Sequence, residues 1–326
     1  MAALPHLSAA ALDALALTPA EIRDALADTI RARAAGQVLS APKSMLKPGD
    51  GRLAMTTLAL DDQTGVMVVK ALVQNPANPA RGLASVNGAI LALDAATGLP
   101  LATLDGPWIT AQRTAALSML AAQHLARPEA ATVAFLGAGV QAQSHLAALA
   151  ALYPLTALRV WSRTEPHALS TQAATLGLPL AHSATAREAI AGADIVISTL
   201  GRAAPPSGAL DAGWLAPGSF AALVDLGHDW APAALAALDL LAIDDLDQER
   251  SLPPDTRLAP LDAISGDLPA LVAGTLAPRR DADQRTAFLF RGPAFADLSL
   301  AALALARADL LRRRVGANPP PPPNVA

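Results

Sequence analysis

One short segment, Val133 to Gln143 (VAFLGAGVQAQ), restricts the possible folds more than any other part of this sequence. Four apolar residues lead directly into Gly137-Ala138-Gly139-Val140-Gln141-Ala142, which indicates a strand, a tight turn and the start of a helix. The first glycine permits the turn, the second lets the backbone approach a phosphate, and the small alanine lets the helix pack on the strand. Because a helix N-terminus attracts anions, the segment predicts a dinucleotide site in which residues 137–141 hold the pyrophosphate.

Composition excludes several other classes of protein. The chain has 326 residues, enough for two domains, and its net charge of −4 without a basic stripe argues against a nucleic-acid partner. It has no cysteine, which excludes disulfides and thiolate sites, and its six histidines show no metal-ligand spacing, so we expect no metal. With no secretory signal pattern and no apolar run of about 20 residues, we expect a cytoplasmic protein without a membrane partner.

The order of predicted elements indicates an α/β fold with two parts. A capping box at Thr18 opens a helix to about Ala35, and strands are expected at residues 53–60, 66–73, 88–94 and 100–105, followed by a helix from 110 to 125 with Thr110 as its N-cap. From Thr132 strands alternate with helices, at 132–136, 157–161, 195–199, 220–224 and 240–243. This alternation is typical of a Rossmann-type doubly wound parallel sheet. A further strand near 286–290 and a helix from about 295 to 314 follow.

The end of the second strand of such a sheet selects the cofactor. An acidic residue there binds the ribose 2′-hydroxyl of NAD, whereas arginine accommodates the 2′-phosphate of NADP. In this chain the strand ends in Ser162-Arg163-Thr164, which offers a guanidinium fork and two hydroxyls and no carboxylate. We therefore expect NADP(H) to be preferred, with NAD(H) possible. The alternative is that Arg163 is an ordinary surface residue. Thr199 and Leu200, after the strand from 195, would border the cofactor.

Several segments together resemble the ornithine cyclodeaminase and mu-crystallin family, over roughly residues 40 to 310. They are Lys70 at a strand end, Asn75-Pro76-Ala77-Asn78 with Arg81-Gly82-Leu83, Val86-Asn87-Gly88, Thr97-Gly98-Leu99-Pro100, and the run LDGPWITAQRTAA from Leu104 to Ala116 ahead of the glycine turn. The resemblance implies that the cofactor domain is inserted in a β-rich α+β domain that binds substrate and forms a homodimer. The implied division is 1–118 and 285–314 for that domain, 119–284 for the cofactor domain, and 315–326 for a disordered proline-rich tail.

The resemblance also implies roles for individual residues. Lys70 matches the family's active-site lysine, Arg113 its substrate-carboxylate arginine, and Thr114 a contact to cofactor phosphate. Lys43 stands where many members have a second carboxylate-binding arginine, a change that keeps the charge but loses the bidentate fork. Asp229 lies where ornithine cyclodeaminases have a catalytic aspartate and several ketimine reductases do not. The glycine and aspartate that follow the family's last strand correspond to Gly292 and Asp297.

Ordinary structural roles stay open for these residues. Lys70 fits a solvated strand edge, Arg113 a surface helix position, and Asp229 the cap of a helix beginning near Pro232; His228, beside it, is weak evidence for a pocket. If the resemblance holds, Lys43, Lys70 and Arg113 would gather cations that suit a carboxylate substrate and lower the pKa of Lys70. Lys70 or Asp229 would then donate or accept the proton in the reaction.

The leading hypothesis is an NADPH-dependent reductase of a small cyclic ketimine carboxylate, Δ1-pyrroline-2-carboxylate or Δ1-piperideine-2-carboxylate, giving L-proline or L-pipecolate. The observation behind the cofactor preference is Arg163 in place of an acidic residue. The alternatives are an ornithine cyclodeaminase, which Asp229 favours, an alanine-type amino-acid dehydrogenase, and a non-catalytic binding protein like mu-crystallin.

Overall fold

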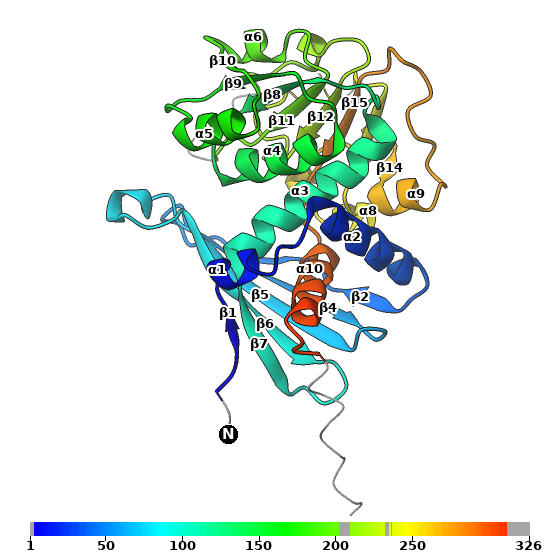
Figure 1. Ribbon diagram of the computed structural model, residues 1–326. Coiled ribbons are helices and arrows are strands. Elements are labelled where there is room, and N and C mark those ends of the chain that lie inside the picture. The colour runs from blue at the N-terminus through cyan, green and yellow to red at the C-terminus, as the bar shows by residue number, and fades with distance from the viewer. Residues whose placement is uncertain (1–2, 202–208, 232–234, 236, 312–326) are drawn as a thin grey trace, which may run out of the picture.

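The computed structural model describes residues 3–201, 209–231, 235 and 237–311. This part of the chain forms two sheets, one of seven strands and one of eight, in the two halves of the molecule (Figure 1). The long helix α3 (Gly106–Leu125) runs from the first half into the second, and so the predicted boundary at 118/119 falls inside one helix. The proline-rich tail and the helix expected from Pro232 lie outside the described residues.

The first sheet has the antiparallel strands that the sequence predicted. Its order is β1-β7-β6-β5-β4-β2, with β3 also paired to β4, and only the β1–β7 pair is parallel. The bounds are β1 (His6–Leu7), β2 (Val38–Ser40), β3 (Ser44–Leu46), β4 (Leu53–Asp61), β5 (Val66–Gln74), β6 (Val86–Asp94) and β7 (Pro100–Asp105). The three shortest strands, β1 to β3, were not predicted, because two or three residues carry no readable alternation.

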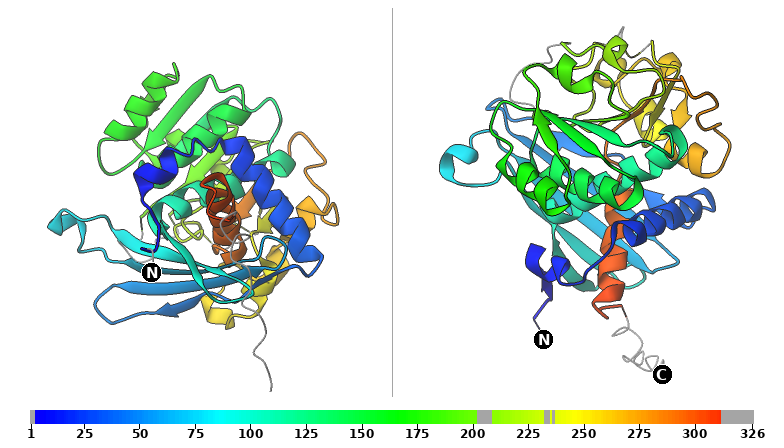
Figure 2. Two further views of the ribbon diagram at one scale, coloured as in Figure 1. Left: turned by 60° about the horizontal axis from the view of Figure 1, so that its bottom comes forward. Right: turned by 45° about the horizontal axis from the view of Figure 1, so that its top comes forward.

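Helices cover one face of this sheet and leave the other open (Figures 1 and 2). They are α1 (Ala9–Asp13), α2 (Pro19–Ala34), α3 and α10 (Ala294–Arg307). Along β5 the side chains alternate, so that Val66, Val68, Lys70 and Leu72 are buried under the helices. The residues between them point outward; Leu58 on β4 and Val73 on β5 are 42% and 41% exposed. The open face is therefore apolar.

The start of α3 differs from the prediction. The helix begins at Gly106, with Asp105 as N-cap accepting a hydrogen bond from the Trp108 N–H at 2.7 Å, and not at Thr110. Asp105 is a strong capping residue and Pro107 suits the first turn, so these two residues extend the helix toward the first sheet by one turn. Thr110 lies inside the helix as a result.

The second sheet is the parallel sheet that the alternating elements predicted. Its order is β10-β9-β8-β11-β12-β15-β13-β14, with every pair parallel. The strands are β8 (Thr132–Leu136), β9 (Ala157–Trp161), β10 (Leu180–His182), β11 (Ile195–Ser198), β12 (Phe220–Leu223), β13 (Leu240–Ile243), β14 (Gly266–Asp267) and β15 (Thr286–Leu289). The α-helices are α4 (Val140–Leu152), α5 (His167–Thr175), α6 (Ala186–Ile190), α8 (Leu246–Arg250) and α9 (Leu268–Val272), and the 3-10 turns in the described chain are η1 (Pro79–Arg81), η2 (Ala212–Trp214), η3 (Pro254–Thr256) and η4 (Leu261–Ala263).

Both faces of the parallel sheet are buried, as a doubly wound fold requires. Phe135 and Phe288 on one face join a core with α3, α4 and α9 that continues into the antiparallel half. Ala134 and Val196 on the other face pack with α6 in a second core. Helix α3 thus belongs to the shared core of the two halves.

The C-terminal strand was placed wrongly by the prediction. β15 lies inside the parallel sheet, between β12 and β13, and pairs with both in parallel register. Only α10, which follows it, packs on the antiparallel sheet. The residues of β15 (Thr286–Leu289) are all buried, and such a continuous apolar run suits the centre of a parallel sheet better than an alternating antiparallel strand.

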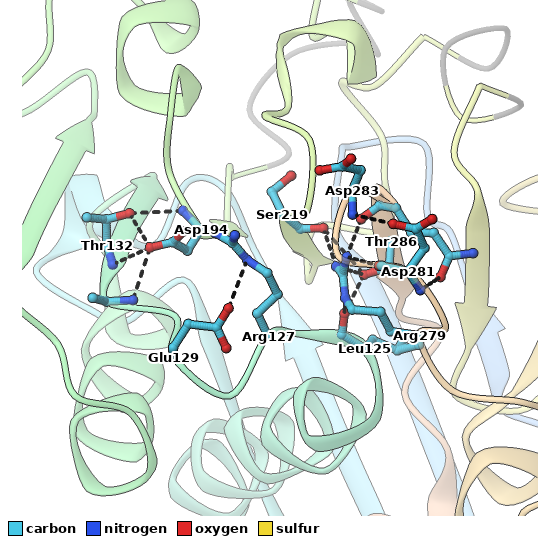
Figure 3. Close-up of polar contacts among 12 residues, drawn as sticks. Leu125, Arg127, Glu129, Thr132, Asp194, Ser219, Arg279, Asp281, Asp283 and Thr286 are labelled. Atoms are coloured by element: carbon cyan, nitrogen blue, oxygen red, sulfur yellow. Dashed lines mark hydrogen bonds and ion pairs between the residues drawn. The ribbon is translucent and has the colours of Figure 1, made fainter.

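Two charged side chains tie the amino ends of the parallel strands together (Figure 3). Asp194 accepts hydrogen bonds from Thr132 Oγ1 at 2.7 Å and Thr132 N at 3.0 Å, and it pairs with Arg127. Arg279 donates to Leu125 O at 2.7 Å and to Ser219 O at 2.8 Å. These contacts fix the loops at the edge opposite the glycine turn.

Candidate functional site

A buried carboxylate, Asp297, lies at the centre of the charged cluster. Its oxygens are 2.6 and 2.7 Å from Lys70 Nζ and 3.0 Å from Arg113 Nε, and Thr57 Oγ1 donates to Oδ2 at 3.0 Å. The Arg113 contact is an ion pair that lacks the alignment of a hydrogen bond. All four residues are at most 6% exposed. The structure therefore brings together two residues, Lys70 and Arg113, that the sequence placed in one site.

The fold explains why these residues meet. Lys70 is an inward-facing position of β5, and Thr57 on β4 is its direct cross-strand partner. Arg113 lies two turns into α3, and Asp297 is in the first turn of α10. Thr57 was missed by the sequence analysis; its inward position opposite Lys70 was the signal that could have found it.

A third cation joins the cluster from the segment before β3. Lys43 is half-buried, and its Nζ donates to the Arg291 carbonyl at 2.5 Å. Gly292, at a φ of +86°, follows that carbonyl, and a Cβ built there would lie 3.0 Å from Lys43 Nζ and 3.3 Å from Arg113 Nη2. Because Gly292 has no side chain, these two cations can both approach this turn closely.

Burial and mutual repulsion shift the ionisation of these groups. Burial lowers the pKa of Lys70 to about 8, with Asp297 opposing the shift and Arg113 adding to it. Burial, then Arg113 and Lys70, lower the pKa of Lys43 to about 7. Burial works to raise the pKa of Asp297, but the attraction of Lys70 and Arg113 outweighs it and holds the pKa below its usual range. Asp297 stays ionised, and Lys70 can exchange a proton near neutral pH.

The glycine turn has the geometry that a dinucleotide needs. Gly137 has a φ of +95°, and a Cβ there would lie 2.8 Å from the Thr199 carbonyl oxygen. At Gly139 a Cβ would meet no atom within 4 Å, and this residue caps α4 without any side-chain hydrogen bond. Ala138, Val140 and Gln141 complete the turn, and Ala142 is fully buried against the strand. The backbone N–H groups at the start of α4 would therefore hold the pyrophosphate of a dinucleotide.

The side chains predicted to select the cofactor lie just after β9. Arg163 is exposed and makes no ion pair with any described residue. The Ser162 hydroxyl donates to the Thr164 carbonyl at 2.6 Å, which turns the chain around Arg163. Thr199 follows β11, and its N–H donates to the Leu136 carbonyl at 2.8 Å, beside the glycine turn. The local geometry leaves the Arg163 guanidinium available to a phosphate.

Helix α3 links the substrate cations to the glycine turn. Thr114, next to Arg113, is buried and donates to the Thr110 carbonyl at 2.6 Å. One turn later Ser118 lies 2.7 Å from Nε2 of His145 on α4, and His145 Nδ1 lies 2.6 Å from the Gln141 carbonyl. Burial lowers the pKa of His145 to about 4, so the imidazole is neutral at pH 7. No sequence pattern pointed to this buried pair.

Asp229 is partly exposed on the loop after β12, at the carboxyl edge of the parallel sheet. Its backbone carbonyl accepts from Leu210 N at 2.9 Å. The loop is fixed by Asp225, which accepts from the Ser198 hydroxyl at 2.5 Å and from Gly227 N at 3.2 Å. This edge is where ligands bind in doubly wound folds, and the catalytic role of Asp229 stays a prediction.

Among the described residues, no three His, Cys, Asp or Glu side chains form a group that could hold a metal ion. No helix in the same ranges is both long and apolar enough to cross a bilayer.

Comparison with known proteins extends the resemblance to nearly the whole chain. The model of the ornithine cyclodeaminase/mu-crystallin family matches residues 8–309. An uncharacterized cyclodeaminase of Sinorhizobium fredii is 34% identical over 248 residues, 71% of this chain and 73% of that protein. A Δ1-pyrroline-2-carboxylate reductase of Bacillus cereus is 35% identical over 140 residues, 42% of this chain and 43% of the relative.

Solved structures share the fold over almost the full length. A Δ1-pyrroline-2-carboxylate reductase of Thermococcus litoralis, in complex with NADH and L-proline, superposes with a TM-score of 0.83 at 25% identity and covers 97% of this chain and 100% of its own. An archaeal alanine dehydrogenase dimer with bound NAD has a TM-score of 0.82 at 22% identity, covering 96% and 98%.

Proposed function

This chain belongs to the ornithine cyclodeaminase/mu-crystallin family, and on that premise we propose that it is an NADPH-dependent reductase of small cyclic ketimine carboxylates. The proposed substrates are Δ1-pyrroline-2-carboxylate and Δ1-piperideine-2-carboxylate, reduced to L-proline and L-pipecolate. The observation that carries the proposal is that Lys70 and Arg113 pair with the buried Asp297, while Lys43 and Arg113 both approach Gly292. Relatives named Δ1-pyrroline-2-carboxylate reductase, and the related structure that holds L-proline, support the same substrate class.

The charges of the cluster suit an anionic substrate. Lys70 is held by Asp297, whereas Lys43 Nζ and Arg113 Nη2 both lie close to Gly292, 3.0 and 3.3 Å from the position of a Cβ built there. A carboxylate bound there would be paired and hydrogen-bonded, which makes its burial tolerable. Arg113 would contribute a planar fork and Lys43 a point charge.

Reduction of a C=N bond needs one hydride and one proton. Residues 137–141, with Thr114 and Thr199, would hold a nicotinamide cofactor, which would supply the hydride. With a pKa of about 8, the Lys70 ammonium can donate a proton toward the ring nitrogen and regain it from solvent near neutral pH. Asp297 keeps Lys70 in place throughout, because its own pKa stays low.

The preference for NADPH rests on Arg163, with Ser162 and Thr164 beside it. Arg163 is exposed at the end of β9, where a 2′-phosphate would lie in this fold. The related Thermococcus litoralis structure holds NADH, so the comparison of the two cofactors is part of the test.

Asp229 favours a second candidate, ornithine cyclodeaminase. The residue lies at the carboxyl edge of the parallel sheet, on a loop held by the buried Asp225. There it would activate the side-chain amine of L-ornithine for ring closure, with loss of ammonia. In that case each turnover would first oxidise the amino acid and later return the hydride to the cyclised intermediate, so that no cofactor would be consumed overall.

We also propose a homodimer that forms through the open face of the antiparallel sheet. Apolar side chains of that face, among them Leu58 and Val73, are exposed in a single chain. Exposed apolar patches of this kind mark interaction surfaces. Light scattering coupled to size exclusion would give the mass, and Leu58→Lys is expected to shift a dimer to a monomer. The cytoplasmic location stays a prediction.

A substrate panel tests the activity. Each of the two cyclic imines, L-ornithine, and pyruvate with ammonia is offered with NADH and with NADPH. We expect NADPH oxidation with a cyclic imine, and faster turnover with NADPH than with NADH. Failure with both ring sizes, alongside ammonia release from L-ornithine with catalytic NAD⁺, would replace the proposal with the cyclodeaminase. Reduction of pyruvate with ammonia would point to a dehydrogenase, and binding without any turnover to a protein like mu-crystallin.

A further inference from the structure

The carboxyl end of β13 brings a second buried carboxylate to the cation cluster. Asp244 is 0% exposed, and its Oδ2 accepts hydrogen bonds from Arg291 N at 2.8 Å and from Gly292 N at 2.6 Å. Its other oxygen, Oδ1, is buried and has no hydrogen-bond partner among the described residues. A carboxylate in this state is costly unless nearby charge compensates it.

The turn that Asp244 holds is the turn that orients Lys43. The Arg291 carbonyl accepts from Lys43 Nζ at 2.5 Å, directly after the N–H that donates to Asp244. The Arg291 side chain is itself anchored by Glu249, at 2.6 Å from Nη2 and 2.8 Å from Nε. The turn is therefore fixed on both sides, and Lys43 is directed to the space beside Gly292.

Charge connects the same residues. Asp244 and Lys43 attract each other, which opposes the burial that raises the pKa of Asp244 to about 6 and lowers that of Lys43 to about 7. Asp244 and, to a smaller extent, Asp297 favour the charged form of Lys43, and Asp297 is already paired with Lys70 and Arg113. Three cations then face two carboxylates, and one positive charge is left for a substrate.

We propose that Asp244 is a positioning residue for the substrate carboxylate. It holds the Arg291–Gly292 turn and attracts Lys43, and it thereby fixes the positions from which Lys43 and Arg113 bind one carboxylate group. The inference rests on the proposed function for the identity of the substrate, and on the contacts of Asp244 and Lys43 with the Arg291–Gly292 turn for the positioning role. Asp244 acts through Lys43 and does not touch the ring that is reduced.

The first test compares two substrates that differ only in the carboxylate. Asp244→Asn keeps an oxygen for the two N–H donors and removes the charge. We expect KM for Δ1-pyrroline-2-carboxylate to rise about ten- to hundredfold, with a small change in kcat. We expect wild type to turn over Δ1-pyrroline, which has no carboxylate, only weakly, and the variant to do so at the same rate. Asp245→Asn, a neighbouring variant whose parent carboxylate pairs with Arg33 at 3.2 Å, should leave both constants near wild type. Equal losses for both substrates would overturn the proposal.

The second test measures binding and separates this inference from the proposed reaction. Pyrrole-2-carboxylate is a planar ring carboxylate that cannot accept a hydride, and its affinity is measured by calorimetry. We expect Asp244→Asn to weaken binding about as much as it raises KM, and to add nothing in a Lys43→Met background. Additive losses would show that Asp244 does not act through Lys43. If wild type binds this probe but reduces neither imine, the proposed reaction fails and the positioning role stands; if it does not bind the probe, the inference fails.

A third variant keeps the proposal testable if Asp244→Asn does not fold. Gly292→Ala leaves both carboxylates in place and puts a methyl group within about 3 Å of Lys43 Nζ and Arg113 Nη2. We expect a loss of pyrrole-2-carboxylate affinity of at least tenfold in a folded protein. Full affinity in this variant would overturn the proposed geometry.

Discussion

The cofactor half and the substrate half of this molecule solve the problem of binding an anion in opposite ways. The glycine turn uses backbone N–H groups and open space from one contiguous segment, residues 137–141. The substrate half uses full charges from three separate segments, Lys43, Lys70 and Arg113, and the buried Asp297 pairs with two of them, Lys70 and Arg113. A backbone site has no charge to leave unpaired, whereas a buried cluster is sensitive to the loss of any member.

The largest effect is expected when the cluster loses its central anion. Asp297→Asn leaves Lys70 and Arg113 buried without a counter-ion, and we expect the free energy of unfolding to fall by about 3–5 kcal/mol. Urea denaturation of both proteins measures the change. Arg163→Ala, at the exposed end of the cofactor half, is the control and should change stability by less than about 0.5 kcal/mol. Equal stability of the two variants would mean that the two halves do not differ in this way.

The buried contact between Ser118 on α3 and His145 on α4 should affect the pH dependence of stability. His145 has a folded pKa of about 4, below the ordinary value, so it stabilises the fold above pH 6.5 and this contribution is lost as pH falls toward 4. We expect His145→Asn to remove about 3 kcal/mol of the decline in unfolding free energy over that interval. Asp225 and Asp244 titrate in the opposite sense in both proteins, and therefore cancel in the difference. Parallel stability curves would contradict the neutral, buried imidazole.

Two glycines of the turn should separate folding from cofactor binding. Gly137→Ala meets the Thr199 carbonyl at 2.8 Å with a positive φ, and we expect a cost of about 1–3 kcal/mol in unfolding free energy. Gly139→Ala meets open space, and stability should change by about 0.5 kcal/mol or less. Both variants should weaken NADPH binding, measured by fluorescence titration. If Gly139→Ala binds NADPH as wild type does, the phosphate does not approach that backbone.

The smallest effect is expected at the end of β9. Arg163→Ala should weaken NADPH about tenfold, the equivalent of about 1.4 kcal/mol, and leave NADH affinity unchanged. The two dissociation constants are measured on the same protein preparation, and Arg159→Ala, on the preceding strand β9, is the matched control. Equal losses for NADH and NADPH would remove the argument for NADP.

The cofactor half was largely readable from the sequence because each of its residues is constrained locally. Gly137 needs a positive φ, Ala142 needs to be small, and both sit within six residues of each other. Lys70 was assigned to the site only through the resemblance to a known family, because the residues on both sides of it in β5 are apolar and show no alternation. Its partner Asp297 lies 227 residues later, and only the resemblance to a known family pointed to it.

The errors have physical causes of the same kind. The start of α3 moved to Gly106 because Asp105 outcompetes Thr110 as a cap. β15 was assigned to the wrong sheet because a short apolar strand does not say which neighbours it pairs with. Asp244 was missed because its role depends on the Arg291–Gly292 turn, which no local pattern predicts.

The position of β15 has a consequence for how this protein is made. On a ribosome, β8 to β14 leave the exit tunnel before residues 286–289 do, so the nascent parallel sheet has an unfilled slot between β12 and β13. The edges of that slot are apolar strands with free backbone groups, which are prone to pairing with other chains. Synthesis must therefore run well past the glycine turn before the cofactor half can close, and a fragment cut at residue 284 would lack an interior strand.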